Sequence, residues 1–484
     1  MSALESGQAA NARALGARLA AGFVLGVASS AYQIEGGVDE GGRGSSSWDA
    51  FAHTRGRIRD GSTGDTAADS YHRYRQDIEL MQELGVAASR FSIAWARILP
   101  EGTLAGGVNS RGIAYYDRLV DSLLEAGIDP VATLFHWDTP LPLERAGGWL
   151  NRETAKHFGD YSQIMADAIG DRVAMWVTMN EPATVTLNGY ALGLHAPGKA
   201  LLFDALPTVH HQLLAHGLAV RALRETGVAG QIGITNVHSP SLPASSSDAD
   251  VAMAELFDLI HNRIFADPVL LGRYPDTPEV IADGLGDILS PLHATPAGDL
   301  EVIGAPLDFY GLNYYFPSVV RAGASASGAS PDGQAPAMRS LPFSFATLPD
   351  HETTGFGWPI APEFLGTVLR DLRKRYGDAL PPIYITEGGV SFPDPAPARG
   401  RVEDRRRIDY LAAHLDAAAT AIADGVDLRG YFVWSLLDNF EWAAGFTQRF
   451  GLVHVDFHDF TRTPKDSFRW FAELTRAVPP ADTP

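Results

Sequence analysis

Short runs of apolar and β-branched residues alternate along the chain with longer stretches in which apolar residues recur at helical spacing. We expect strands at residues 23–29, 88–95, 130–137, 174–179, 231–236, 307–315, 382–386 and 428–434. We expect helices at residues 71–84, 115–126, 155–169, 206–226, 363–376 and 405–423. Eight strands that alternate with helices are typical of a parallel (β/α)8 barrel. The pattern therefore predicts an α/β protein with a single (β/α)8, or TIM, barrel.

Two segments interrupt the alternation without resembling linkers between folded units. Residues 322–349, between the sixth and seventh strands, are rich in Ala, Ser, Gly and Pro, and residues 239–248 form a shorter polar insertion after the fifth strand. Loops of this length are usually functional rims or mobile. We expect long βα loops over the active-site face. The predicted organisation is an N-terminal tail, frayed or helical, over residues 1–21 and one catalytic barrel over residues 22–478.

Composition narrows the classes of partner. The 484 residues are 45% hydrophobic and 20% charged, which is ordinary for a soluble globular protein. A formal net charge of −20 disfavours nucleic acid and anionic membranes as partners. Residues 1–21 are interrupted by Glu5, Arg13 and Arg18 and lack the apolar core of a signal peptide. No apolar run is long enough to span a membrane. We expect a cytoplasmic protein, whose oligomeric state the sequence does not indicate.

Two short segments carry candidate catalytic carboxylates. Residues 178–182 contain Glu181 and residues 385–389 contain Glu387, and each segment follows an apolar, β-branched run. Each glutamate should therefore lie at the end of a buried strand, the end from which α/β barrels deliver catalytic side chains. A pair of carboxyl groups held in this way is the usual equipment for cleaving a glycosidic bond. The two segments together point to a glycosidase.

Further motifs in the same order extend the resemblance to most of the chain. The motifs lie at residues 31–36, 90–95, 135–138, 311–315, 434–442 and 449–451. Together with the two glutamate segments, they make the sequence resemble the β-glucosidases of glycoside hydrolase family 1 over residues 22–469. The resemblance implies a retaining exo-β-glycosidase that releases terminal non-reducing β-D-glucosyl residues from β-glucosides or cello-oligosaccharides, as in cellulose degradation. β-Galactosides and β-fucosides are expected side substrates. No cofactor or metal is implied.

The resemblance makes Glu181 the acid/base and Glu387 the nucleophile. In a retaining enzyme the two carboxyl groups lie only about 5–5.5 Å apart. Two carboxylates this close cannot both ionise cheaply, so we expect a raised pKa for Glu181. Arg90 lies in an apolar strand and must be paired. The resemblance implies that Arg90 and Tyr315 both donate hydrogen bonds to Glu387, the former holding it ionised.

The same resemblance assigns the sugar-binding residues. Hydrogen bonds to the sugar hydroxyls are expected from Gln33, His136, Asn180 and Glu441, and the aromatic faces from Trp434 and Trp442. Asn180 should contact the 2-hydroxyl. Asn313 is expected to support the acid/base, Phe450 to close the sugar pocket and Trp358 to lie at the aglycone rim. The peptide between Trp434 and Ser435 is expected to be cis.

Four positions depart from the family pattern, Gly388, Ala183, Ala96 and Leu25, and three other functions are alternatives to a β-glucosidase. Gly388 replaces the usual Asn after the nucleophile and predicts a looser loop, and Ala183 replaces a common Trp. A 6-phospho-β-glycosidase is disfavoured because Glu441 would repel a phosphate. A non-catalytic sugar-binding barrel is disfavoured because both glutamates are present. A metal-dependent hydrolase lacks ligands, since His210, His211 and His216 have no partner at ligand spacing.

Overall fold

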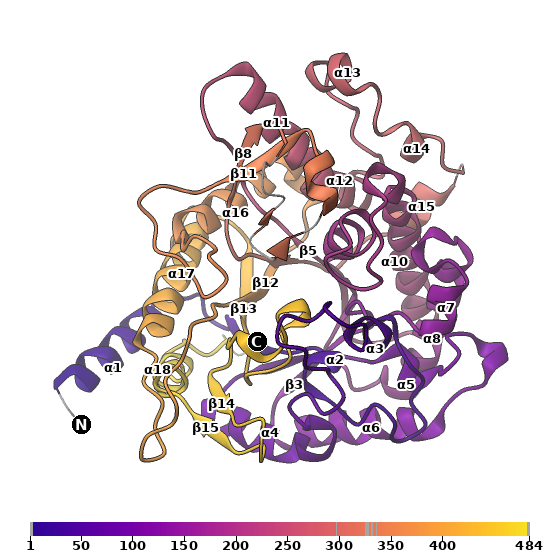
Figure 1. Ribbon diagram of the computed structural model, residues 1–484. Helices are drawn as coiled ribbons and strands as arrows, with labels where there is room; N and C mark the ends of the chain where they lie inside the picture. The colour runs from indigo at the N-terminus through magenta and orange to yellow at the C-terminus, as the bar shows by residue number, and fades with distance from the viewer. Residues whose placement is uncertain (1–2, 297, 325–328, 331–332, 335, 482–484) are drawn as a thin grey trace.

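Eight parallel strands close into a barrel at the centre of the molecule, with helices packed around it (Figure 1). The computed structural model describes residues 3–296, 298–324, 329–330, 333–334 and 336–481. The barrel strands are β1 (Val24–Ala28), β2 (Ala88–Ser92), β3 (Asp129–Thr133), β4 (Met175–Asn180), β5 (Gln231–Val237), β7 (Phe309–Asn313), β12 (Ile383–Gly388) and β13 (Leu428–Trp434). Strand β13 pairs with β1 and closes the sheet. All eight predicted strands and the predicted fold class are confirmed.

The outer layer contains all six predicted helices, which are therefore confirmed. They are α4 (Ser70–Leu84), α6 (Ser110–Glu125), α8 (Glu153–Ile169), α10 (Pro207–Thr226), α16 (Pro362–Tyr376) and α17 (Arg405–Ala423). In α6 the buried Tyr116, Val120 and Leu123 recur every three or four residues, so one face packs against the barrel. Helices α4 and α10 end at Gly85 and Gly227, in the left-handed conformation that glycine adopts readily.

The N-terminal segment is helical and packs on the barrel. Helix α1 (Ala3–Gly16) lies against α18 (Asp466–Thr475), the last helix of the described chain. Ala12 and Leu15 of α1 are buried, and Arg13 forms a 3.0 Å ion pair with Glu473 of α18. Of the segment expected to be frayed or helical, residues 3–16 thus form a helix, and residues 17–21 connect it to the barrel.

The chain between β5 and β12 holds further helices and strands that the sequence pattern did not predict. It includes α11 (Asp248–Asp258), the π-helix η5 (Leu259–Arg263), α12 (Ile264–Leu271), α13 (Glu279–Leu285), α14 (Ser290–His293) and α15 (Asp299–Ile303). Strands β6 (Ser241–Pro243), β8 (Ser318–Ala322) and β11 (Phe343–Ala346) form a separate sheet in the order β11-β8-β6. Short elements of this region are β9 (Ala329–Ser330), β10 (Gly333–Gln334) and the 3-10 helix η6 (Pro336–Ser340).

Further short elements join the barrel strands on either side of this region. They are α2 (Ala31–Ile34), α3 (Ser47–Ala52), α5 (Trp95–Ile98), α7 (Leu141–Arg145), α9 (Pro182–Thr184), the π-helix η3 (Val185–Ala191), the 3-10 helix η8 (Trp442–Thr447), β14 (Val453–Val455) and β15 (Arg462–Pro464). Two of these elements begin at or directly after residues predicted for the site: α9 follows Glu181, and η8 begins at Trp442.

Three hydrophobic cores surround the site, and two of them belong to the barrel. The larger one fills the space between the barrel and its helices. The smaller one fills the barrel itself, where Val131, Val177, Phe309 and Phe432 pack from different strands. Trp434 belongs to this inner core, at the end of β13. The packed interior of the barrel therefore supports the aromatic side chain on which a sugar is expected to rest.

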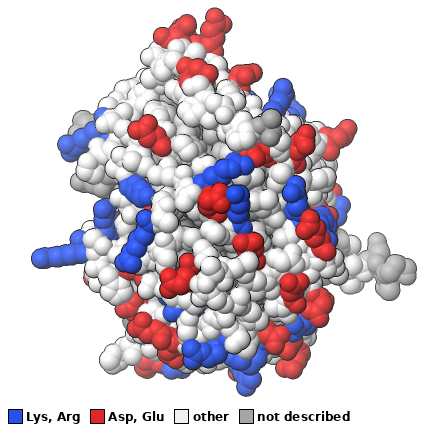
Figure 2. Space-filling view, turned by 90° about the vertical axis from the view of Figure 1, so that its right-hand side faces the viewer, with Lys and Arg blue, Asp and Glu red and all other residues white. Residues whose placement is uncertain are grey.

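The surface carries charges of both signs. On the face shown in Figure 2, acidic and basic side chains are interspersed, although the whole chain has a formal net charge of −20. In the part of the chain that the structure describes, no helix combines the length and the apolar character that crossing a bilayer would require.

Candidate active site

A pocket of about 150 Å³ brings together eight of the twelve predicted site residues. Its wall includes His136, Glu181, Tyr315, Glu387, Trp434, Glu441, Trp442 and Phe450. The other four, Gln33, Arg90, Asn180 and Asn313, are at most 1% exposed. They lie behind the wall and reach it through hydrogen bonds. An apolar cavity of similar volume can hold one benzene ring, so the pocket has the scale of a single ring.

Glu387 is held by donors on both of its oxygens. It lies near the end of β12, where Arg90 of β2 donates to its Oε1 at 2.6 Å and the Tyr315 hydroxyl donates to its Oε2 at 2.7 Å. Burial raises the pKa of Glu387, whereas the Arg90 charge and the Tyr315 hydrogen bond lower it; the net direction is upward. Arg90 is fully buried, so its charge acts on Glu387 with little solvent screening. These contacts stabilise the ionised form.

Glu181 meets only uncharged donors. It directly follows β4, with a left-handed backbone (φ 48°). Its Oε1 accepts a hydrogen bond from Asn313 at 2.6 Å, and its Oε2 accepts one from Thr184 at 2.6 Å. Burial, and then the nearby charge of Glu387, raise the pKa of Glu181 to about 7. Near neutral pH this carboxyl group can therefore carry the proton that its neighbour lacks.

Asn180 links the two carboxyl groups and fixes the proton on His136. Arg90 donates to the Asn180 Oδ1 at 2.6 Å. Since a guanidinium group can only donate, the opposite atom of this amide must be its nitrogen. That nitrogen lies 3.2 Å from the His136 Nε2, which therefore accepts and has no proton. Burial, helped by the Arg90 charge, lowers the pKa of His136 well below its usual value, which agrees with a neutral ring. One amide hydrogen of Asn180 remains for a ligand.

Asn313 is oriented by a chain of hydroxyl groups. Thr235 donates to Thr386 at 3.1 Å, and Thr386 donates to the Asn313 Oδ1 at 2.8 Å. The Asn313 nitrogen then donates to Glu181 and to the Asn180 Oδ1. Its amide is thus fully used, and it reaches the acid/base candidate directly.

The sugar-facing wall is formed mostly by the segment after β13. The peptide between Trp434 and Ser435 is cis, which confirms the prediction. The Trp434 ring is stacked at 5.7 Å on His136. Gln33 donates to Glu441 at 3.2 Å and to Asn439 at 3.1 Å, so both hydrogens of its amide hold this segment in place.

Several pocket-lining residues had no role predicted from the sequence, among them Trp137, Thr184 and His195. Trp137 donates from its ring nitrogen to the Asn180 carbonyl at 2.9 Å, and its ring packs 4.5 Å from that of Trp442. Thr184 donates a hydrogen bond to Glu181, and the half-buried His195 lies beside Trp137. Trp137, Glu181 and Trp442 all have positive φ. Non-glycine residues in this conformation cluster at functional sites, but it cannot be read from a sequence.

Trp358 stands in an aromatic group at the mouth of the pocket. Its ring stacks on Phe356 at 4.5 Å and on Phe316 at 4.9 Å, and it meets the Phe450 ring at 6.3 Å. This placement suits the aglycone rim that was predicted for it.

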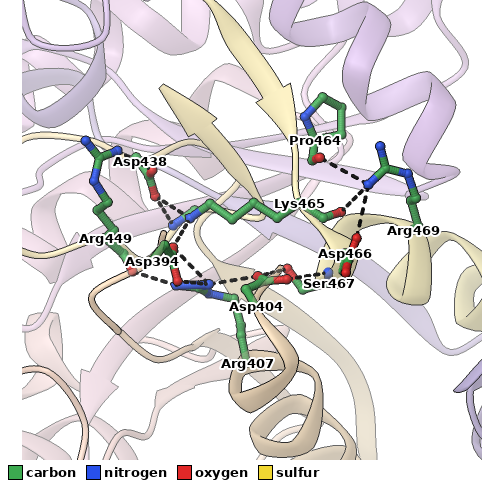
Figure 3. Close-up of polar contacts among 11 residues, drawn as sticks. Asp394, Asp404, Arg407, Asp438, Arg449, Pro464, Lys465, Asp466, Ser467 and Arg469 are labelled. Atoms are coloured by element: carbon green, nitrogen blue, oxygen red, sulfur yellow. Dashed lines mark hydrogen bonds and ion pairs between the residues drawn. The ribbon is translucent and has the colours of Figure 1, made fainter. Parts of the chain in front are cut away.

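A buried ionic network, defined here as Asp394, Asp404, Arg407, Asp438 and Lys465, anchors the segment after β13 (Figure 3). The Lys465 ammonium contacts Asp394 and lies 2.8 Å from Asp438. Burial alone would raise the pKa of Asp438, but Lys465 and its other cationic neighbours hold it below its usual value. Since removing one partner of such a network leaves an uncompensated buried charge, the network fixes the backbone that carries Glu441 and Trp442.

Gly388 does not lie in a loose loop, in contrast to the prediction. It is the last residue of β12 and is buried. A Cβ atom at this position would lie 2.3 Å from the Tyr431 hydroxyl oxygen. The Tyr431 side chain therefore occupies the space in which the family's usual Asn would sit.

The three histidines considered as metal ligands contact other protein groups. His210 lies 2.8 Å from Asp299, His211 lies 2.8 Å from the Trp149 carbonyl, and His216 lies 2.6 Å from Thr178. Over the described ranges, no group of three or more His, Asp or Glu side chains is arranged to hold a metal ion.

Comparisons with known proteins agree with this geometry. The family model "Glycosyl hydrolase family 1" matches residues 16–478. The chain is 44% identical over 455 residues to β-glucosidase A of Acetivibrio thermocellus, covering 94% of this chain and 97% of that relative. It is 42% identical over 464 residues to the bifunctional β-D-glucosidase/β-D-fucosidase of Bifidobacterium breve, covering 93% and 96% of the two.

Solved structures show the same relationship. The psychrophilic β-glucosidase BglU of Micrococcus antarcticus matches with a TM-score of 0.88 at 43% identity, covering 96% of this chain and 99% of that one. The family 1 β-glucosidase of Thermotoga maritima matches with a TM-score of 0.86 at 41% identity, covering 96% and 99%. The resemblance inferred from the sequence is confirmed, and the chain belongs to glycoside hydrolase family 1.

Proposed function

We propose that this protein is a retaining exo-β-glucosidase in which Glu387 is the nucleophile and Glu181 the acid/base. The observation that carries the proposal is the contrast between two buried carboxyl groups in one pocket. Glu387 is paired with a buried guanidinium, whereas Glu181 meets neutral donors and has a pKa of about 7. The Arg90 charge favours the ionised form of Glu387, and a pKa of about 7 lets Glu181 hold its proton up to about neutral pH, which is the division of labour that double displacement requires.

The reaction proceeds in two steps. Glu387 attacks the anomeric carbon while the Glu181 proton passes to the departing glycosidic oxygen, which leaves a glycosyl–enzyme ester and an ionised Glu181. Glu181 then removes a proton from water, and the water oxygen displaces Glu387 from the same carbon. Two inversions give net retention. We assign the Asn180 amide hydrogen that His136 does not accept to the 2-hydroxyl, where a hydrogen bond strengthens as charge develops on the ring.

The pocket and the relatives support glucose as the sugar that is bound. The curated relatives carry β-glucosidase names, and one is bifunctional with β-D-fucosides, which supports fucosides as side substrates. Glu441, oriented by Gln33, supports binding of the 4- and 6-hydroxyls. An acidic group at this place disfavours a 6-phosphate, and the presence of both glutamates disfavours a non-catalytic role.

The stereochemical course tests the proposal. In heavy water, NMR of the first sugar released from a β-glucoside should show the β-anomer, and α-glucose appearing first would overturn the mechanism. Glu387→Gly should remove turnover and leave the fold intact. Glu352→Gly, at a glutamate whose side chain is 78% exposed, is the matched control and should retain activity. If Glu387→Gly kept a rate within about tenfold of wild type, its activation barrier would be only ~1.4 kcal/mol higher, and Glu387 would be excluded as the nucleophile.

Two finer points remain predictions. We infer cello-oligosaccharides from cellulose breakdown as natural substrates because relatives with the name 1,4-β-D-glucan glucohydrolase share about 41% of their residues with this chain. The cytoplasm is the expected location. Product analysis with cellotriose and fractionation of the source cells test these two points separately.

A further inference from the structure

Glu181 needs a hydrogen-bond partner in two protonation states, since it serves as an acid in the first step of the proposed reaction and as a base in the second. A carboxylic acid has a proton to donate, whereas a carboxylate can only accept. A single partner suits both states only if it can reverse the direction of its hydrogen bond. Among the described residues, the side chains that bond directly to this carboxyl group are those of Asn313 and Thr184.

Asn313 cannot reverse its hydrogen bond. Its Oδ1 accepts from Thr386 at 2.8 Å, while its nitrogen donates to the Glu181 Oε1 at 2.6 Å and to the Asn180 Oδ1 at 3.2 Å. The Asn180 Oδ1 also accepts from Arg90, a side chain without an acceptor, so the Asn180 amide cannot turn either. The Asn313 amide is therefore a fixed donor to Oε1, which leaves Oε2 for the proton of the acid form.

Thr184 faces that second oxygen. Glu181 is the N-cap residue of α9, Pro182 is the first residue of this helix and Thr184 the third. Proline is preorganised for the first helical position, and the Thr184 amide closes the turn with a 3.0 Å bond to the Glu181 carbonyl. The turn brings the Thr184 hydroxyl to 2.6 Å from Oε2. In the described part of the chain this hydroxyl has no other hydrogen-bond partner, so its O–H bond is free to rotate.

The Thr184 hydroxyl stabilises the ionised form of Glu181 more than the acid form. Burial, and then the Glu387 charge, raise the pKa of Glu181 to about 7, and the hydrogen bonds from Asn313 and Thr184 lower it. In the glycosyl–enzyme ester Glu387 carries no charge, so burial is then the main obstacle to the ionisation of Glu181. A hydrogen bond to an ionised acceptor is roughly twice as strong as one between neutral groups. The second step therefore depends on these hydrogen bonds.

We propose that Thr184 is a positioning residue that makes Glu181 competent as the base of the second step. Before the first step its hydroxyl accepts the proton on Oε2, and after that proton has passed to the glycosidic oxygen it donates its own hydrogen to Oε2. In the second step Oε2 takes a proton from water, whose oxygen displaces Glu387, and the Thr184 hydroxyl turns back. Thr184 keeps its own proton throughout. The inference rests on the proposed function and names a residue that controls one of its two steps.

Thr184→Val removes the hydroxyl and keeps the branched shape of the side chain. With dinitrophenyl β-glucoside the leaving group departs without protonation, so the first step needs no proton from Glu181, and breakdown of the ester limits kcat. The variant should therefore lower kcat and KM together by about tenfold at pH 6, the factor that one pKa unit represents. The ratio kcat/KM should stay within about twofold of wild type. A defect in folding or in sugar binding would lower kcat/KM instead.

Azide and serine provide two rescues. Azide attacks the anomeric carbon of the ester without a base, releases Glu387 as a carboxylate and gives β-glucosyl azide, so it should restore the kcat of Thr184→Val. Thr184→Ser retains a hydroxyl group and should keep the kcat of wild type without azide. Thr184→Ala is a second variant without the hydroxyl and should match Thr184→Val, which keeps the test valid if valine packs poorly.

The basic limb of the pH profile is an independent measurement. For phenyl β-glucoside, which has a poor leaving group, kcat/KM requires Glu181 in its acid form, and this form persists up to its pKa. Because the lost hydrogen bond favours the ionised form, its removal raises the pKa of Glu181. The basic limb should therefore move about one pH unit upward in Thr184→Val, while the acid limb, set by Glu387, should stay in place.

Thr277→Val is the matched control. Thr277 also donates its hydroxyl to a carboxylate, that of Asp287, at 2.8 Å. Both residues lie outside the wall of the catalytic pocket. This variant should keep the kcat, the KM and both pH limbs of wild type.

The outcomes separate this inference from the proposed function. Equal kcat values for wild type and Thr184→Val, an unmoved basic limb, or a fall in kcat that azide leaves unchanged would overturn the role of Thr184. In each of these cases wild type would still hydrolyse β-glucosides with retention. The proposed function fails only if wild type cleaves no β-glucoside or releases α-glucose first.

Discussion

Replacing Tyr315 with phenylalanine should narrow the pH range in which the enzyme works, and from the acid side only. The Tyr315 hydroxyl donates a hydrogen bond to the Glu387 Oε2 at 2.7 Å, while Arg90 donates one to the Oε1. The variant removes one of two donors and retains the ring that packs against Trp358. Because the lost hydrogen bond favours the ionised carboxylate, its removal raises the pKa of Glu387.

The size of the effect follows from the charge on the acceptor. A hydrogen bond to a charged group contributes about 1.5–3 kcal/mol, and each pH unit of titration corresponds to about 1.36 kcal/mol. The acid limb of the kcat/KM profile should therefore move about one to two pH units toward neutral pH. The basic limb, set by Glu181 with its pKa of about 7, should stay in place. The bell-shaped dependence of kcat/KM on pH therefore becomes narrower, and its maximum value falls.

The measurement is kcat/KM for an activated aryl β-glucoside from pH 4 to pH 9. Tyr314→Phe is the matched control, because the buried Tyr314 hydroxyl donates to the Ala361 carbonyl at 2.7 Å and not to Glu387. That variant should keep both limbs of wild type. If Tyr315→Phe lowered activity equally at every pH, or moved only the basic limb, the role assigned to its hydroxyl would be wrong.

Three other changes have defined outcomes. Glu181→Gln should remove the basic limb of the kcat/KM profile, because the variant lacks the carboxyl group whose pKa of about 7 sets that limb. It should also slow the hydrolysis of glucosides with poor leaving groups by about 10²–10⁴. An equal loss of rate for activated phenyl glucosides would contradict the acid/base role. The wild-type kcat/KM for a β-glucoside should exceed that for the 6-phospho-β-glucoside by at least about 10², which corresponds to ~2.7 kcal/mol. Glu441→Ser should reduce this ratio. Equal kcat/KM values in wild type would refute the role given to Glu441. Lys465→Met should lower the free energy of unfolding, measured by chemical denaturation, by about 3–5 kcal/mol. Lys156→Met, at an exposed lysine, is the control and should leave this free energy unchanged. Equal effects of the two substitutions would disprove the role of the network.

The barrel and the catalytic pair could be predicted because each depends on local sequence. A buried strand needs a run of apolar residues, and a carboxylate that follows such a run must lie at the end of the strand. Glu181 and Glu387 are placed in this way whatever the surrounding loops do. The contacts of Arg90 and Tyr315 with Glu387 came from the family pattern, since 297 and 72 residues separate the partners along the chain.

The parts that were not predicted depend on backbone geometry and on distant packing. Trp137 and Trp442 take positive φ, which apolar periodicity does not report. The sheet of β6, β8 and β11 is built from three- to five-residue strands in Ser-, Gly- and Pro-rich sequence, where the strand signal is weak. Gly388 predicted a loose loop because the side chain that fills its space, Tyr431, is distant in sequence.

The buried ionic network also sets the order in which the enzyme can mature during its synthesis. Lys465 follows Asp394 by 71 residues along the chain. At a translation rate of about 5–20 residues per second, ~4–14 s pass between the synthesis of these two residues. Asp394 has no lysine to neutralise it for the whole of that interval, and Asp438 has none while the last 27 residues before Lys465 are made. A nascent chain halted at residue 460 would contain both catalytic glutamates, yet the segment that carries Glu441 and Trp442 would lack its anchor. Sugar binding is therefore among the last properties that the growing polypeptide acquires.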